Sequence, residues 1–212
     1  TTPPYTDDPE TAIARIKSIE NGDGYNLSHM TCCLHTGTHI DAPSHFIKAG
    51  DNVESIPLEK TVGLAYVIKC EGELSRKDAE MMINKASAVD PECAKRILIK
   101  GNAVVSSSCA EYFAERGVYL LGVESQTVGP EDAPMEVHLI LLRAKTVLLE
   151  GIRLGDVPEG KYDLMIVDPP AFAKHRGALK NALRAYQRLN AAAIGKVAPG
   201  GLVFTFSCSQ VV

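Results

Sequence analysis

Three histidines and one aspartate lie close together near the start of this 212-residue chain: His35, His39, Asp41 and His45. Imidazole and carboxylate groups are the ligands that suit zinc, manganese and related ions. Gly37 and Pro43 disfavour a helix here, and in an extended segment residues two apart share a face. The odd-numbered side chains are therefore expected to project together, although Pro43 bends the path before His45. This pattern predicts a metal site on extended backbone; the alternative is a histidine-rich loop with only hydrogen bonds.

Strand-like and helix-like segments alternate along the rest of the chain. Apolar, β-branched runs predict strands at residues 65–70, 96–100, 118–123, 146–150, 162–168 and 202–206. Helices are expected from a Ser75 cap to about Lys85, from Ser107 or Ser108 to Arg116 before Gly117, and over residues 177–197. The chain is 45% hydrophobic and 23% charged, which is enough apolar material for a core. We therefore expect an α/β fold of one domain, with or without a small appendage.

Charge is distributed unevenly along the chain. The net charge of −4 gives no overall footprint for nucleic acid, so a nucleic-acid partner is not expected. Residues 169–212 nevertheless contain six basic and no acidic residues. Such asymmetry indicates a segment of different origin, with a boundary near residue 165. The alternative is a single domain that ends in a basic helix.

The cysteines and the apolar runs bear on the compartment. None of the six cysteines forms a Cys-x-x-Cys pair, which favours buried or free thiols in a reducing compartment. No apolar run reaches the ~18 residues of a membrane span. The polar N-terminus does not have the pattern of a signal peptide. We therefore expect a cytoplasmic protein that is not embedded in a membrane.

The motif His-x-Gly-Thr-His-x-Asp-x-Pro-x-His at residues 35–45 resembles that of the cyclase-like metal-dependent hydrolases. This family includes bacterial kynurenine formamidase and isatin hydrolase. The resemblance extends over residues 25–163 and includes segments 56–59, 96–100, 114–118, 149–152 and 157–160. It implies the swivelling β/β/α fold and a homodimer or higher homo-oligomer in which a neighbouring subunit can complete the pocket. One departure is Glu124, where the family tends to have an aspartate after the strand. The substrate preference of this chain is therefore expected to differ from that of the family more than its metal binding does.

The resemblance also implies a set of site residues. His138 and Glu150, twelve positions apart, match two further ligands of the family. Together with His35, His39 and Asp41 they would hold one or two divalent ions, zinc or manganese. His45 would be the general acid/base, since its intrinsic pKa lies near the working pH.

The chemistry implied by such a site is hydrolysis of a small-molecule amide. A bound ion can lower the pKa of its water from 15.7 to about 7, which provides a metal-bound hydroxide near neutral pH. The implied reaction breaks an amide or formamide C–N bond. The arylformamidase reaction of tryptophan catabolism, from N-formylkynurenine to kynurenine and formate, is the leading hypothesis. The alternative from a different class is a non-catalytic metal-binding module.

From about Lys161 the sequence resembles a second family, the class I S-adenosylmethionine-dependent ribosomal RNA 5-methylcytosine methyltransferases. The matching segments are residues 162–176, 199–202 and 204–209. The resemblance implies a target-base loop at Asp168, Pro169 and Pro170 and an attacking thiol at Cys208. No glycine-rich cofactor loop precedes this part, so we expect an inactive fragment rather than a cofactor-binding enzyme. We therefore predict a hydrolase domain over residues 1–163 and an appended fragment over 164–212, joined as a fusion or chimera.

Overall fold

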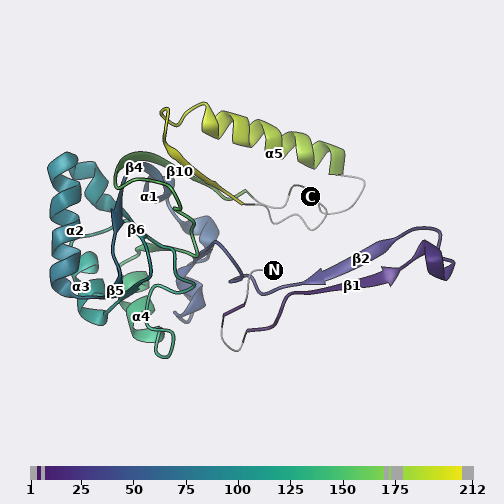
Figure 1. Cartoon of the computed structure of the whole chain (residues 1–212), viewed down its shortest axis with the longest axis horizontal. Coiled ribbons are helices and arrows are strands. Elements are labelled where there is room, and N and C mark those ends of the chain that lie inside the picture. Colours follow the sequence, from purple (N-terminus) through teal and green to yellow (C-terminus); the bar gives the residue numbers. More distant parts are fainter. Residues whose placement is uncertain (1–3, 6–7, 170–171, 173–178, 207–212) are drawn as a thin grey trace.

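The computed structural model describes residues 4–5, 8–169, 172 and 179–206. Its centre is a seven-stranded mixed sheet with the strand order β11-β10-β4-β6-β8-β9-β3 (Figure 1). The strands are β3 (His39–Asp41), β4 (Val62–Lys69), β6 (Arg96–Lys100), β8 (Leu120–Val123), β9 (Val147–Glu150), β10 (Gly160–Val167) and β11 (Leu202–Thr205). Strands β4, β6, β8 and β9 are parallel to one another, whereas β3 and β10 run antiparallel to their neighbours β9 and β4. The α/β class expected from the sequence is confirmed.

Helices pack on one face of this sheet and form the larger part of the core. They are α2 (Arg76–Val89), α3 (Ser107–Glu115) and α4 (Met135–Arg143). Buried Ile83, Phe113 and Leu141 from these helices share a cluster with Ile97 and Leu121 of the sheet. A short helix α1 (Leu58–Thr61) precedes β4, and β5 (Gly72–Leu74) pairs with β7 (Ala103–Val105) in a small separate sheet.

The opposite face of the sheet is also buried. Leu98, Leu120 and Leu149 alternate with the helix-facing residues and pack with Ile152 and Leu164. Burial on both faces explains why the central strands are continuous apolar runs rather than alternating ones.

Most predicted elements are present, with shifted ends. Helix α2 begins at the predicted Ser75 cap, where Ser75 and Asp78 form a capping box, but it continues to Val89 rather than Lys85. The predicted cap of α3 at Ser107 or Ser108 is wrong. The cap is Ser106, whose hydroxyl accepts a hydrogen bond from the Cys109 amide at 3.3 Å.

A two-stranded hairpin that was not predicted projects from the body (Figure 1). It consists of β1 (Ala12–Lys17) and β2 (Leu27–Thr31). Ile13 lies directly opposite Met30, and their side chains are 69% and 53% exposed. Ile16 nearby is 56% exposed. An isolated two-stranded hairpin is marginally stable in water, so this apolar surface requires an explanation.

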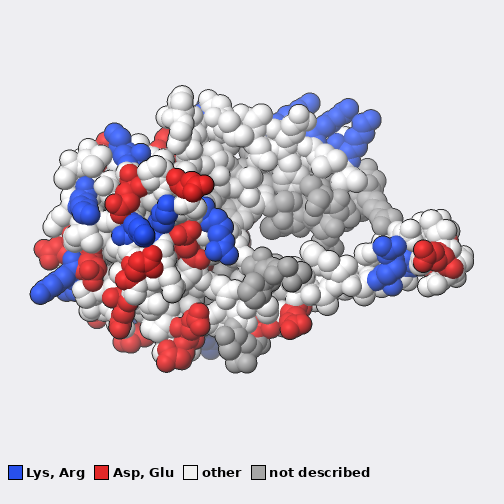
Figure 2. Space-filling view, in the orientation of Figure 1, with Lys and Arg blue, Asp and Glu red and all other residues white. Residues whose placement is uncertain are grey.

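The C-terminal part continues the sheet. Strand β10 pairs with β4 on one side and with β11 on the other, so the predicted boundary at residue 163 falls within a single strand. Helix α5 (Leu179–Ile194) precedes β11 and presents basic side chains at the upper right of Figure 2, where no acidic ones lie beside them. The division of the chain at residue 163 stays a prediction. Within the described ranges, no helix is long and apolar enough to cross a membrane.

Candidate metal centre

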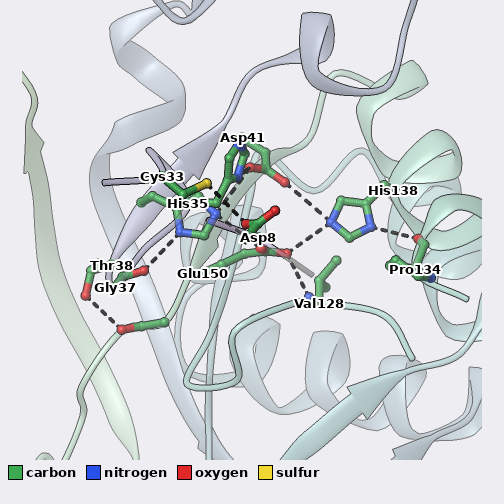
Figure 3. Close-up of polar contacts among 12 residues, drawn as sticks. Asp8, Cys33, His35, Gly37, Thr38, Asp41, Val128, Pro134, His138 and Glu150 are labelled. Carbon is green, nitrogen blue, oxygen red and sulfur yellow. Dashed lines mark hydrogen bonds and ion pairs between the residues drawn. The ribbon is translucent and has the colours of Figure 1, made fainter. Parts of the chain in front are cut away.

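Strand pairing at one edge of the sheet brings the predicted ligands together (Figure 3). His39 of β3 is the direct antiparallel partner of Glu150 of β9, so both side chains project from the same face. Asp41 lies two residues further along β3 and shares that face. His138 reaches the same point from α4. The turn before β3 is tied to the end of β9, because the Thr38 hydroxyl donates to the Gly151 carbonyl at 2.7 Å.

The five predicted ligand residues form two triads that share Asp41. One triad is His35, His39 and Asp41, and the other is Asp41, His138 and Glu150; within each, the ligand atoms lie within 4.8 Å of one another. His35 Nδ1 and His39 Nε2 lie 3.1 and 3.4 Å from Asp41 Oδ1. His138 Nε2 lies 3.4 Å from Asp41 Oδ2 and 3.1 Å from Glu150 Oε1. His39 Nε2 also lies 3.4 Å from Glu150 Oε2.

The hydrogen bonding of these atoms fits a divalent cation. His39 Nε2 and both Asp41 carboxylate oxygens are buried, and none has a hydrogen bond of good geometry to another described residue. Leaving such atoms buried and unpaired is costly unless another group satisfies them. The opposite ring nitrogens are held by backbone carbonyls: His39 Nδ1 by Gly37 at 3.0 Å and His138 Nδ1 by Pro134 at 2.7 Å. Such contacts orient a histidine toward a metal.

Burial and pairing shift the pKa values of the cluster. Burial lowers the pKa of His39 and of His138, but the Asp41 and Glu150 carboxylates outweigh it and raise these pKa values to about 10 and about 9. Burial raises the pKa of Asp41 and Glu150, but the adjacent imidazoles outweigh it and hold both pKa values below the usual range. Without a metal, the cluster is therefore a set of mutually neutralising charges. A cation that binds here displaces the imidazole protons.

His45 lies beside the triads but in a different environment. It ends a 3₁₀ turn (Pro43–His45), and its ring stacks on that of His35 with a centroid distance of 4.1 Å. Burial lowers its pKa. A neutral imidazole next to the ligands is suited to accept a proton.

A cavity of about 270 Å³ opens above the cluster. Besides the ligands and His45, it is lined by residues that the sequence analysis did not single out: Tyr5, Asp8, Phe46, Gln126, Thr127 and Pro134. Gln126 and Thr127 follow the carboxyl end of a parallel strand, which is where ligands bind in α/β sheets. Their position after a predicted strand could therefore have identified them as cavity residues from the sequence. Glu124 does not line the cavity. It accepts hydrogen bonds from the Gly101 and Leu154 amides at 2.8 Å, which gives it a structural role.

The model of the "Putative cyclase" family matches residues 1–130. The chain belongs to the cyclase family. A kynurenine formamidase from Erythrobacter litoralis (strain HTCC2594) is 28% identical over 176 residues, which cover 77% of this chain and 79% of the relative. The sequence-based assignment to the cyclase-like metal-dependent hydrolases is confirmed.

Several solved structures have a fold similar to that of this chain. A potential metal-dependent hydrolase with cyclase activity superposes with a TM-score of 0.59 at 26% identity, covering 76% of this chain and 81% of that one. A predicted metal-dependent hydrolase from Bacillus stearothermophilus gives 0.57 at 25% identity, with 76% and 82% covered. An isatin hydrolase bound to thioisatinate gives 0.57 at 16% identity, with 77% and 78% covered. The predicted swivelling β/β/α architecture is confirmed.

The residues assigned to the methyltransferase resemblance are only partly described. Asp168 and Pro169 directly follow β10. Pro170 and Cys208 lie outside the described residues.

Proposed function

We propose that this member of the cyclase family is a metal-dependent amide hydrolase of the arylformamidase type. The observation that carries the proposal is the pair of triads that share Asp41, whose buried ligand atoms include three without a well-formed hydrogen bond and which lie below an open cavity. The similarity to a kynurenine formamidase supports the choice of a formamide substrate.

His35, His39 and Asp41 would hold one ion, and Asp41, His138 and Glu150 a second. Zinc or manganese is compatible with these nitrogen and oxygen donors. A divalent ion bound here supplies Lewis acidity and lowers the pKa of a water molecule to about 7.

His45 would carry the proton of the reaction. An oxygen–carbon bond forms as water attacks the carbonyl carbon, and an imidazole nitrogen of His45 accepts the proton that the water loses. The C–N bond then breaks, and His45 returns that proton to the leaving nitrogen. The lowered pKa of His45 keeps its ring neutral near pH 7, as the first transfer requires.

The cavity also offers an apolar wall for an aryl group. The Phe46 ring lies 4.6 Å from that of His138, and Tyr5 lines the same cavity. An aromatic substrate ring can pack against these side chains while its formamide group reaches the cluster.

Formanilide hydrolysis is the direct test of this function. We expect the metal-loaded protein to hydrolyse formanilide, to lose the activity when a chelator removes the metal, and to regain it when zinc or manganese is returned. Metal binding without turnover of any amide in a panel would instead identify a non-catalytic metal module. Thermal stabilisation by S-adenosylmethionine would indicate the methyltransferase alternative.

We further propose that the β1–β2 hairpin mediates a homodimer. Its exposed Ile13 and Met30 form a paired apolar surface that packing against a second copy would bury. Size-exclusion chromatography with light scattering should give a dimer mass for the natural protein and a monomer mass for the Ile13→Lys, Met30→Lys variant. Ala14→Lys alters the opposite face of the same strand, and the dimer should persist. A monomeric natural protein would contradict the proposal.

A further inference from the structure

The wall of the cavity has one carboxylate that the hydrolysis mechanism does not use. Apart from the proposed ligands, Asp8 is the only carboxylate that lines the cavity within the described ranges. No described lysine or arginine lines it. The two acidic ligands, Asp41 and Glu150, lie at the buried cluster, where a bound metal would balance them. Among the described residues, Asp8 therefore has no lysine or arginine partner in the cavity wall.

Asp8 is held in place by Cys33 (Figure 3). The Cys33 thiol donates to Asp8 Oδ2 at 3.1 Å, and no hydrogen bond from a described residue reaches the second carboxylate oxygen. This hydrogen bond orients the carboxylate without neutralising its charge.

Tyr5 is a second lining residue that the hydrolysis mechanism does not use. The Tyr5 hydroxyl donates to the Glu131 backbone carbonyl at 2.6 Å. Burial raises the pKa of Tyr5, and the charges of Glu131, Glu150, Asp132 and Asp8 raise it further. The neutral phenol adds an aromatic surface to the cavity that Asp8 also lines. A carboxylate next to an aromatic ring is a favourable environment for an ammonium group.

We propose that Asp8 is a specificity-determining residue that selects amide substrates bearing a positively charged amino group. This inference rests on the proposed amide hydrolysis and adds the charge of the substrate to it. An ammonium group on the aryl ring would pair with Asp8 while the formamide reaches the triads. An uncharged substrate of the same shape would lack that pairing.

Two formanilides of matched size test the proposal, one with a meta aminomethyl group and one with a meta ethyl group. We expect kcat/KM to favour the cationic compound by about tenfold, since a half-exposed charge pair at ~4 Å contributes on that scale. The preference should reside mainly in KM, because the contact is the same in the ground state and the transition state. It should also weaken as ionic strength rises.

Asp8→Asn should bring the ratio of the two kcat/KM values close to one. Glu10→Gln removes one charge from the same segment at an exposed position that does not line the cavity, and it should keep the natural ratio. A ratio rather than an absolute rate is compared, so a general loss of folded protein does not imitate the effect.

Calorimetric binding of the two matching acetanilides to the metal-loaded protein separates the two proposals. Turnover without a charge preference, or a preference that survives Asp8→Asn, overturns the role of Asp8 and leaves the hydrolase proposal intact. Absence of turnover with tighter, Asp8-dependent binding of the cationic acetanilide overturns the hydrolase proposal and supports Asp8 as a cation-selecting residue. Equal binding of both acetanilides without turnover overturns both proposals.

Discussion

Asp41→Asn is expected to remove both metal ions and to lower formanilide hydrolysis by more than about a hundredfold, since even the partners of metal ligands contribute 10–100-fold. Asp41 is the only described residue common to the two triads, and each of its oxygens faces histidine nitrogens. An amide of the same shape supplies one neutral oxygen in place of two charged ones. Metal content measured by mass spectrometry and formanilide turnover should therefore fall together.

Asp51→Asn is the matched control for this substitution. Asp51 is exposed and lies outside both triads, although it is only ten positions away in the sequence. Its replacement should leave metal content and turnover at the natural level. Retention of two ions and full turnover by the Asp41→Asn protein would show that the triads are not the metal centre.

Gly151→Ala is expected to weaken both the fold and the metal centre. Gly151 has a φ of +65°, and an added Cβ would lie 2.7 Å from the Gly37 carbonyl oxygen. The left-handed backbone alone costs about 1–2 kcal/mol for a residue with a side chain. The clash is with backbone, so the turn that precedes β3 must move away from β9, and the Thr38–Gly151 hydrogen bond is lost with it. His35 and His39 flank that turn.

Gly117→Ala separates the strain from the clash. Gly117 has a φ of +66°, but an added Cβ there would meet nothing within 4 Å. Urea unfolding should show a loss of about 1–2 kcal/mol for this variant with unchanged metal affinity. Gly151→Ala should lose more stability than Gly117→Ala, and only Gly151→Ala should bind zinc more weakly in a competition titration. Equal losses and equal affinities would mean that the turn tolerates the added methyl group.

The elements that were predicted well are those whose signals are local. The apolar runs of the central strands and the Ser75 cap depend on neighbouring residues, and the structure contains them. Helix α4 was missed because Pro134 precedes it in place of a polar capping side chain. The β1–β2 hairpin was missed because its apolar residues are exposed on a ribbon that has no core to face. The α3 cap was misplaced because three consecutive serines offer the same side chain, and only the backbone conformation selects Ser106.

The candidate site divides in the same way. The first triad lies within seven consecutive residues, and the sequence alone predicted His35, His39 and Asp41 as one group. The extended backbone expected for all three is wrong for His35, which lies in the turn before β3; only His39 and Asp41 share a strand face. Residue spacing alone did not place His138 and Glu150 beside the first triad. The family resemblance implied that they belong to the same site. Only the tertiary structure brings these two residues close to the first triad. Antiparallel pairing of β3 with β9 places Glu150 opposite His39, and packing of α4 brings His138 to Asp41. The contact between Asp8 and Cys33 likewise joins residues 25 positions apart, which only the folded chain brings within 3.1 Å.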